Sequence, residues 1–409
     1  MALLSVNEAR ERILTQFHPV PSETLALSEC MNRVLAQDIA AANDLPLFDN
    51  SSMDGFAVRS ADVSNAAASP PSLRVVADIP AGASPTISLA SGEAARIMTG
   101  AHMPEGADAV VPVEETDFTN RDAGSPPPGE VRIFKPVNQG DNTRPRGMDV
   151  RAGEVVLHKG RALKAPDLGL LAMFGHAAVR VHRKPRVALF SSGDELLEVD
   201  APLESGKIRD SNSYMLASLI ADSGAEVTRL GVARDDLESV RALLDQAVDF
   251  RSDLILSSAG VSVGAFDFVK EAVQSKGRLD FWRVNMRPGK PLAFGEYRGI
   301  PFIGLPGNPV SAFVGFEVFV RLAIQRLGGA SGEGRRTVRV RCEEEIISDG
   351  RESYLRAKIR DEDGTILARL TGHQGSGNLL SLAQANALLI IPAGVKCVPA
   401  GQEVNAWLL

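Results

Sequence analysis

Hydrophobic and polar positions follow different periods in different parts of the chain. In "VNEARERIL" (residues 6–14) the apolar positions recur at helical spacing, which predicts an amphipathic helix. Between residues 45 and 150, short apolar runs are interrupted every ten or so residues by Gly, Pro and Ser, as is typical of a small β-rich domain. A strand follows, and then a helix that we expect to run from about Pro166 to Gly175.

Beyond residue 184, continuous apolar runs such as "RVALFSS" and "SDLILSS" alternate with amphipathic segments such as "DDLESVRALLDQAVD". This alternation predicts a parallel, doubly wound α/β sheet with helices on both faces. After "GGASGEGRR" the period returns to two, and in "TVRVRC" and "YLRAKI" apolar residues alternate with charged ones. The last ~75 residues are therefore expected to form a small antiparallel barrel or sandwich.

Composition narrows the class of protein. The 409 residues carry a net charge of -7, so no broad basic surface for nucleic acid is expected. The three cysteines are odd in number and far apart, which argues against a disulfide framework and for a reducing compartment. We find neither a signal peptide nor a run of ~20 apolar residues, so we expect a cytoplasmic protein without a membrane span.

Ligands of a doubly wound sheet bind beyond the carboxyl ends of its strands. Two strand ends here carry loops of small polar residues, "SSAGVSVGAFD" and "PGNPVSAF", in which backbone N–H groups and hydroxyls can converge on an anion. One such loop is more often an ordinary strand-to-helix turn, but two on one sheet edge favour phosphate binding. The residues concerned are Ser258, Gly260, Ser262 and Gly264 in the first loop and Pro306, Gly307, Asn308, Pro309 and Ser311 in the second.

Acidic residues stand beside these loops. Asp194 and Glu195 follow the first strand, and Asp267 closes the Gly/Ser loop. Each of them alone could cap a helix. Three acids beside two anion-binding loops would repel a phosphate unless a cation intervened, and Mg²⁺ takes carboxylate, phosphate and water oxygens. The sequence therefore predicts a metal–phosphate site with these three acids as metal ligands.

The segment "MRPGKP" adds the opposite charge before the last strand of the sheet. Arg287 and Lys290 flank a Pro-Gly pair in a short rigid loop. The loop could be a solvated basic turn. Two fixed cations beside backbone N–H groups could instead bind a compact oxyanion.

Taken together, these motifs resemble those of the molybdopterin molybdenumtransferases, the family of MoeA and the gephyrin E domain. The motifs are "SSGDEL", "GKIRDSN", "SSAGVSVGAFD", "MRPGKP" and "GLPGNPVSAF", with "NSSMDGFAV", "IMTGAHMPEGADAVV" and "NTRPRGMDV" upstream and "GHQGSGNLLSLAQANALLIIP" near the C-terminus. They occur in the family's order over nearly the whole chain.

The resemblance implies a multidomain α/β plus β fold in an elongated homodimer. The implied domains are a discontinuous linking domain (1–45 and 148–182), a β-rich insertion domain (46–147), a doubly wound MogA-like molybdopterin/nucleotide-binding domain (183–328) and a C-terminal β-barrel (329–409). The implied reaction transfers molybdenum from molybdate to adenylylated molybdopterin, releases AMP and requires Mg²⁺ or a similar cation.

Site residues also follow from the resemblance. The implied catalytic residues are Asp54, Asp149, Asp194, Glu195, Asp235, Asp267 and Lys290. The implied binding residues are Thr99, Arg144, Gly193, Ser258, Gly260, Ser262, Gly264, Arg287, Pro291, Pro306, Gly307, Asn308, Pro309 and Ser311. Asp54, far upstream in the β-rich domain, would face the partner subunit's nucleotide loops in a composite site.

Simpler roles stay open for several of these residues. By sequence alone Asp54 is part of an Asp-Gly turn, Asp235 could cap the helix "LESVRALL", and Arg144 and Asp149 could be turn residues. The chain also departs from the family at Ala259, Arg287 and Ala387. A tungsten-inserting paralogue, a molybdopterin adenylyltransferase and a non-catalytic scaffold are the alternative functions, and contact with other cofactor-biosynthesis proteins is a further expectation.

Overall fold

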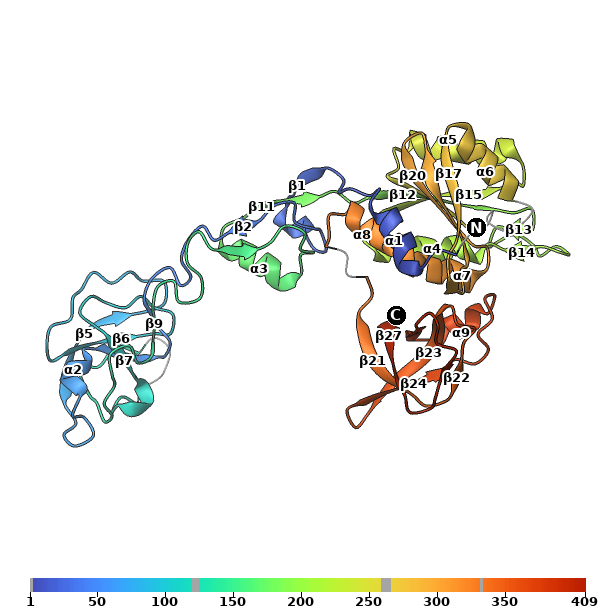
Figure 1. Cartoon of the computed structure of the whole chain (residues 1–409). Helices are drawn as coiled ribbons and strands as arrows, with labels where there is room; N and C mark the ends of the chain where they lie inside the picture. The colour runs from blue at the N-terminus through green and yellow to red at the C-terminus, as the bar shows by residue number, and fades with distance from the viewer. Residues whose placement is uncertain (1–2, 120–124, 259–265, 332–333) are drawn as a thin grey trace. The chain divides into compact units, whose positions relative to one another are not determined.

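The computed structural model describes residues 3–119, 125–258, 266–331 and 334–409. The chain divides into two compact units (Figure 1). The large unit comprises residues 1–37, 159–172 and 176–409, and the small unit comprises residues 38–158 and 173–175.

A six-stranded sheet organises the large unit. Its order is β15 (Glu226–Ala233), β12 (Arg186–Ser192), β16 (Leu254–Ser258), β20 (Ile300–Leu305), β19 (Pro291–Tyr297) and β17 (Gly277–Arg283). The first four strands run parallel to one another. The predicted doubly wound sheet is confirmed in these strands.

The other two strands correct the prediction of an all-parallel sheet. β19 runs antiparallel to both β20 and β17. The reason is the turn between β19 and β20, where Tyr297 pairs with Ile300 across only Arg298 and Gly299. Both turn residues have positive φ, +49° and +79°, as tight two-residue hairpins require. A parallel crossover needs about a dozen residues, so this connection permits only an antiparallel pair.

Helices cover both faces of the sheet, as predicted (Figure 1). One face packs against α4 (Ser211–Asp222), α7 (Pro309–Gly315), α8 (Arg321–Leu327) and the N-terminal helix α1 (Val6–Leu14). The other face packs against α5 (Leu237–Asp249) and α6 (Phe266–Ser275). Leu189 and Phe190 of β12 belong to opposite cores because successive strand residues point to opposite faces.

A closed barrel forms the C-terminal part of the large unit. Its strands are β21 (Thr337–Cys342), β23 (Glu352–Glu362), β24 (Thr365–Leu370), β25 (Ala387–Ile391) and β27 (Glu403–Leu408). β23 pairs with both β24 and β25, which closes the ring, and the predicted barrel is confirmed. The pairing of β21 with β24 is parallel, so the barrel is mixed rather than purely antiparallel.

The small unit is β-rich, as predicted. Its five-stranded sheet has the order β7 (Ala109–Pro112), β4 (Gly55–Val58), β6 (Glu93–Ile97), β5 (Ser72–Ile79) and β8 (Glu130–Arg132). Two short strands, β3 (Asn50–Ser51) and β9 (Thr143–Arg144), pair beside it. Gly55 is required at the start of β4, since a Cβ there would lie 2.0 Å from the Val111 carbonyl oxygen.

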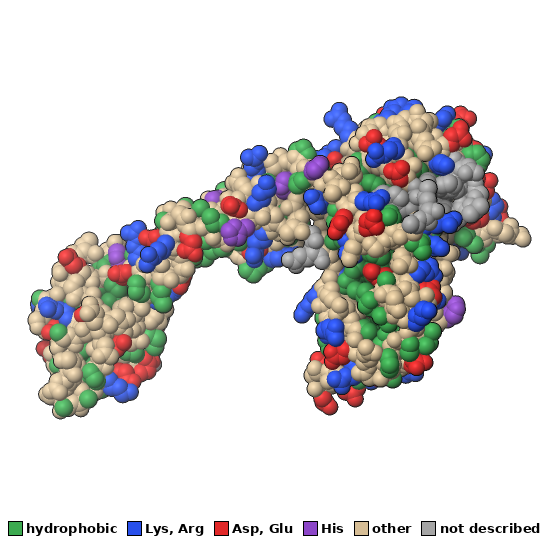
Figure 2. Space-filling model, in the orientation of Figure 1, with side chains coloured by type: hydrophobic (Ala, Val, Ile, Leu, Met, Phe, Trp, Pro, Cys, Tyr) green, Lys and Arg blue, Asp and Glu red, His purple; other side chains and the backbone are tan. Residues whose placement is uncertain are grey.

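Acidic and basic side chains are interspersed on the face that Figure 2 shows. Among the described residues, no helix combines the length and the apolar character needed to cross a bilayer.

Candidate active site

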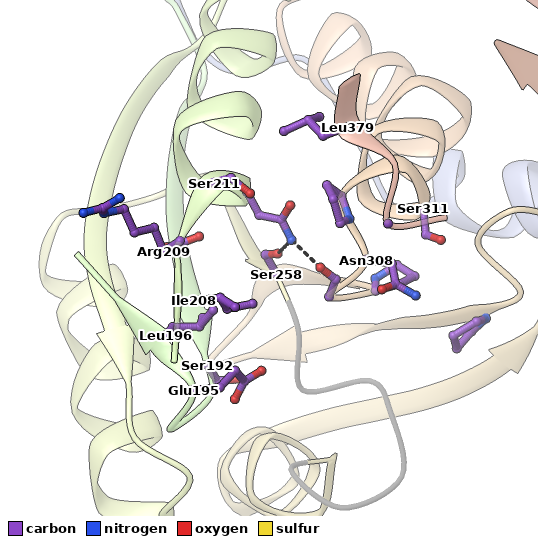
Figure 3. Close-up of a pocket in the computed structure, with 17 residues that line it drawn as sticks. Ser192, Glu195, Leu196, Ile208, Arg209, Ser211, Ser258, Asn308, Ser311 and Leu379 are labelled. Atoms are coloured by element: carbon purple, nitrogen blue, oxygen red, sulfur yellow. Dashed lines mark hydrogen bonds between the residues drawn. The ribbon is translucent and has the colours of Figure 1, made fainter. Parts of the chain in front are cut away.

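A cavity of about 640 Å³ opens at the carboxyl ends of β12, β16 and β20, where the fold predicts a ligand site (Figure 3). Several predicted binding residues line it. Ser258 comes from the end of β16 and Pro291 from the start of β19, and Glu195 follows β12. The loop after β20 contributes Pro306, Gly307 and Asn308, and the first turn of α7 contributes Pro309 and Ser311.

Asn212, in the first turn of α4, joins two of these strand ends. Its Nδ2 donates to Ser258 Oγ (2.8 Å) and to the Gly307 carbonyl oxygen (2.7 Å), the bonds dashed in Figure 3. Asp210 caps the same helix by accepting a bond from the Ser213 N–H (3.1 Å). Both line the cavity, and neither was predicted as a site residue, although both belong to the motif "GKIRDSN".

The C-terminal barrel domain supplies another part of the cavity wall. Gly377 and Leu379 line it. Ser376 is joined to the loop after β20 twice: its hydroxyl accepts a bond from Asn308 Nδ2 (3.1 Å), and its carbonyl accepts one from the Val310 N–H (3.0 Å). The loop before α9 (Leu379–Ala383) and the loop after β20 thus form one continuous surface.

A buried arginine holds this C-terminal loop. Arg356 of β23 is 0% exposed, and its guanidinium donates to the carbonyl oxygens of His373, Gln374 and Gly375 and to Ser381 Oγ, at 3.0–3.2 Å. Burial lowers the pKa of Arg356 to about 10, with a further contribution from Arg287. In "YLRAKI" the charged residues alternate with apolar ones, yet the Arg356 guanidinium is buried, because these loop carbonyls satisfy it inside the protein.

Two acidic residues meet at the ends of the neighbouring strands β12 and β15. The Asp235 N–H donates to Asp194 Oδ1 (3.2 Å), and the Asp194 N–H reaches Asp235 Oδ2 (3.4 Å). Burial raises the pKa of Asp235, and the negative charges of Asp194 and Glu195 raise it further. Asp236, not Asp235, caps α5. The simpler role of Asp235 as a helix cap is therefore excluded.

Gly193 shapes the turn that carries the first acids. Its φ is +147°, and a Cβ there would lie 2.5 Å from Glu195 Oε2. Only glycine lets the Glu195 side chain lie this close to the backbone.

The predicted metal site is described only in part. Asp267 belongs to α6, but its side chain lies outside the described residues, as do Ala259, Gly260, Ser262 and Gly264. Among the residues that the structure does describe, no three His, Cys, Asp or Glu side chains are grouped closely enough to hold a metal by themselves. Asp194, Glu195 and Asp235 lie at this sheet edge but do not form such a group.

The basic loop lies beside the first turn of α7. Arg287, in the short strand β18 (Met286–Arg287), forms an ion pair with Asp349 at 3.8 Å. Gly289 turns the chain with φ of +98°, and a Cβ there would lie 3.5 Å from the Ser311 carbonyl oxygen. Lys290 is exposed and has no ion pair within the described parts of the chain.

In the small unit, four predicted residues form two pairs. Asp54 Oδ1 accepts bonds from the N–H and the hydroxyl of Thr99, both 2.7 Å long, and these two bonds lower the pKa of Asp54. Arg144 Nη2 and Asp149 Oδ2 form an ion pair at 2.5 Å. Asp54 precedes β4 directly and is held by Thr99, which follows β6, so it belongs to a defined pair and not to a hairpin turn.

Family models and known proteins match nearly the whole chain. Residues 4–175 match the MoeA N-terminal region (domain I and II), residues 188–326 a probable molybdopterin binding domain and residues 339–409 the MoeA C-terminal region (domain IV). A molybdopterin molybdenumtransferase from Nostoc sp. is 40% identical over 391 residues, covering 94% of this chain and 88% of the relative. Molybdopterin molybdenumtransferase 2 of Mycobacterium tuberculosis is 39% identical, covering 98% and 99%.

Solved structures agree with the sequence matches. The molybdopterin biosynthesis moeA protein of Pyrococcus horikoshii has a TM-score of 0.84 at 31% identity, and each chain covers 100% of the other. The fold and the site thus define a multidomain protein with a molybdopterin-binding α/β domain. The chain belongs to the molybdopterin molybdenumtransferase family, as its motifs predicted.

Proposed function

We propose that this protein inserts molybdenum from molybdate into adenylylated molybdopterin, releasing AMP and forming the molybdenum cofactor. One observation carries the proposal: Asn212 joins Ser258 and the loop after β20 around a cavity at the sheet edge. The family assignment supports molybdopterin as the ligand class that we propose for this cavity. The proposed enzyme acts in the cytoplasm.

The loops at the strand ends are proposed to hold the phosphate groups. Ser258 and the residues from Pro306 to Ser311 supply hydroxyl and backbone groups around the cavity. A phosphoanhydride held there is cleaved mainly by positioning and by neutralisation of its charge. Ser262 and the glycines of the first loop are proposed to contribute in the same way.

Mg²⁺ is proposed to bind beside Asp194, Glu195 and Asp235, with Asp267 as a further ligand. The described acids fit a cation, because Asp235 Oδ1 is buried without a partner among the described residues and its neighbours are negative. When bound, Mg²⁺ neutralises phosphate charge and polarises the anhydride. The protein's own contribution is to hold Asp194 and Asp235 through each other's backbone N–H groups.

Lys290 and Arg287 are proposed to attract molybdate, a tetrahedral dianion. Asp349 lies 3.8 Å from Arg287 but is bound mainly by Arg351. Lys290 is exposed and has no ion pair among the described residues, so its positive charge is available to an oxyanion.

We further propose a homodimer with a composite site. The two pairs of the small unit, Asp54 with Thr99 and Arg144 with Asp149, would act together with the partner's large unit. Support comes from the exposure of both carboxylates and from their places in the family's motifs. The linking (1–45 and 148–182), insertion (46–147), nucleotide-binding (183–328) and barrel (329–409) domains remain our proposed division of the chain.

The test of function is an assay with purified protein, adenylylated molybdopterin, molybdate and Mg²⁺. We expect AMP release that depends on molybdate, together with product that activates a cofactor-free molybdoenzyme. AMP release no greater than with heat-inactivated protein would refute the proposal. Consumption of ATP with free molybdopterin would assign the preceding adenylylation step instead.

The composite site has its own test. An Asp54→Ala protomer is mixed with an Asp267→Ala protomer after each variant alone is shown to be inactive. Mixed dimers should recover up to half of the wild-type activity per dimer, because one site is intact. No recovery would refute the composite arrangement.

A further inference from the structure

A carboxylate that the proposed reaction does not use is buried in the large unit. Glu317 lies in the π-helical turn η3 (Phe316–Val320), and its side chain is 0% exposed. Its Oε2 accepts bonds from Arg321 Nε (2.6 Å) and Arg335 Nε (3.0 Å). Its Oε1 accepts bonds from Arg321 Nη2 (3.0 Å) and Arg335 Nη2 (2.9 Å). Two guanidinium forks therefore bind one carboxylate through four charge-assisted hydrogen bonds.

A second carboxylate balances the charge of this group. Asp222, at the surface, places its Oδ2 3.0 Å from Arg321 Nη2 and 3.9 Å from Arg335 Nη2. Asp222, Glu317, Arg321 and Arg335 thus form an ion network with two positive and two negative side chains. Because a buried charge is costly unless it is paired, the network favours the arrangement in which its members stay together.

Two of the elements that the network joins begin at the cavity. α4 begins with Ser211, which lines the cavity, and ends with Asp222. α7, η3 and α8 follow one another without a break from Pro309, which also lines the cavity, through Glu317 and Arg321. None of the four network residues lines the cavity itself.

The third element leads to the barrel. Arg335 lies two residues before β21, the first strand of the barrel. The barrel in turn supplies Gly377 and Leu379 to the cavity wall. The network therefore connects the three parts of the wall, α4, α7 and the barrel, at a place away from the ligand.

The barrel's direct contacts with the cavity loops are weaker in kind. Ser376 makes two neutral hydrogen bonds, one with Asn308 Nδ2 and one with the Val310 N–H. β18 and β23 pair over two residues only. Charge-assisted bonds are stronger than neutral ones, so the bonds between Arg335 and Glu317 are a firmer attachment of the barrel to the helix that begins at the cavity.

We propose that Glu317 and Arg335 are positioning residues, which hold the barrel's part of the cavity wall against the first turn of α7. They touch no substrate and act through Ser376 and Gly377. The consequence for substrate binding rests on the proposed function, whereas the effect on the contact between the barrel and α7 does not.

The experiment measures amide hydrogen exchange of the full-length protein at single residues. The reporter is the Val310 N–H, which donates to the Ser376 carbonyl (3.0 Å). The internal reference is the Phe316 N–H, which donates to the Ala312 carbonyl within the same helical run. Arg335→Met removes one guanidinium and leaves Glu317 paired with Arg321.

The next residue of the chain offers a matched control. Arg336 is exposed and forms no ion pair with any residue that the structure describes. Arg336→Met changes the net charge equally, one position further along the same segment. Arg335→Lys is the conservative variant, since an ammonium cannot bind both carboxylate oxygens as a planar fork. Thermal unfolding of each variant establishes that it is folded.

In Arg335→Met, exchange at Val310 should become about tenfold faster or more, while exchange at Phe316 stays within about twofold of wild type. The KM for adenylylated molybdopterin should rise about fivefold with kcat within about twofold, because the wall is displaced and the acids at the sheet edge are not. Arg335→Lys should give intermediate values, and it carries the same comparison if Arg335→Met does not fold. Arg336→Met should change neither exchange nor KM.

Three results would overturn the inference. Unchanged exchange at Val310 in the folded variant would mean that the barrel contact does not depend on the network. Equally faster exchange at Val310 and Phe316 would mean that the network stabilises only the helix. Equal effects of Arg335→Met and Arg336→Met would mean that the loss of charge alone is responsible. Wild-type protein that forms no cofactor would refute the proposed function and leave the exchange result standing.

Discussion

Asp194 and Asp235 hold each other's loops: each carboxylate accepts a bond from the other residue's backbone N–H, at 3.2 and 3.4 Å. The two residues follow neighbouring parallel strands, so the bonds fix the spacing of two negative charges at the sheet edge. Burial, together with the negative charges of Asp194 and Glu195, raises the pKa of Asp235 although the Asp194 N–H lowers it, so the ionised form of Asp235 is costly without a cation.

Asp235→Asn should raise the unfolding temperature near neutral pH, by about 2 °C or more, while abolishing cofactor formation. The sign follows from the raised pKa. The folded protein disfavours the ionised form of Asp235, so ionisation lowers the free energy of unfolding. This loss of stability is absent below the ordinary aspartate pKa and grows as pH rises through the raised value. Unfolding temperatures of both proteins between pH 4 and pH 8, without Mg²⁺, measure this difference.

The neighbouring residue supplies the contrast. Asp236→Ala removes the cap of α5 and should destabilise the protein by about 1 kcal/mol. If Asp235→Asn were destabilising to the same degree at pH 8, the ionised Asp235 carboxylate would not be destabilising the folded protein.

Thr99→Ala tests the pair that holds Asp54. The variant loses the hydroxyl bond to Asp54 Oδ1 and keeps the backbone bond, so the lowered pKa of Asp54 should move back toward its ordinary value. We expect the reaction to need ionised Asp54, so the acid limb of the pH–activity profile should shift to higher pH in this variant. Activity at neutral pH should fall about tenfold through lost positioning.

Ser64→Ala, in the same unit, removes a hydroxyl bond to the Ala61 carbonyl and serves as the control. It should leave the pH profile unchanged. An unshifted acid limb in Thr99→Ala would mean that ionised Asp54 does not limit the reaction.

Much of the architecture could be predicted from the sequence, because buried parallel strands and period-two strands have distinct patterns. The antiparallel direction of β19 was not predicted, because it is caused by the two-residue turn at Arg298 and Gly299. A search for alternating strands and helices does not detect such a turn. The burial of Arg356 could not be predicted either, since no pattern in β23 reveals that loop carbonyls more than fifteen residues away satisfy its guanidinium.

The candidate site was predicted unevenly for a similar reason. The Gly- and Ser-rich loops could be recognised in the sequence, and the residues after β20 line the cavity as expected. Asp210 and Asn212 look like an ordinary helix start in "RDSN". Their place in the cavity wall becomes visible only when Ser258 and Gly307, 46 and 95 residues beyond Asn212, lie against the amide.

Arg356→Met should loosen the C-terminal wall of the cavity. It leaves the carbonyls of His373, Gln374 and Gly375 without their common donor, at a cost of about 3 kcal/mol in the free energy of unfolding. The KM for adenylylated molybdopterin should rise, since Ser376 and Gly377 follow directly. Denaturant unfolding and steady-state kinetics measure both effects.

Arg360→Met, on the same strand, is the control. Its ion pairs with Glu343 and Glu362 lie on the surface, so its loss should cost less than about 1 kcal/mol and leave KM unchanged. Equal effects of the two substitutions would show that Arg356 has no special role in the loop.

Lys290→Ala should raise the concentration of molybdate needed for half-maximal activity by about tenfold or more, while AMP binding stays within about twofold of wild type. The reason is that the exposed Lys290 ammonium has no carboxylate partner among the described residues and can attract the oxyanion. Arg298→Ala, on the hairpin turn, is the control and should change neither quantity. Equal losses of molybdate use and AMP binding in Lys290→Ala would contradict the proposed division of roles.

The central claim is that molybdenum transfer and AMP release belong to one reaction at this site. The most direct measurement is a single-turnover reaction of adenylylated molybdopterin with molybdate, in which AMP and pterin-bound molybdenum are quantified together. We predict one molybdenum bound for each AMP released with wild-type protein, and neither product with Asp235→Asn. AMP released in full without molybdenum on the pterin, or equal yields from the variant, would contradict the account.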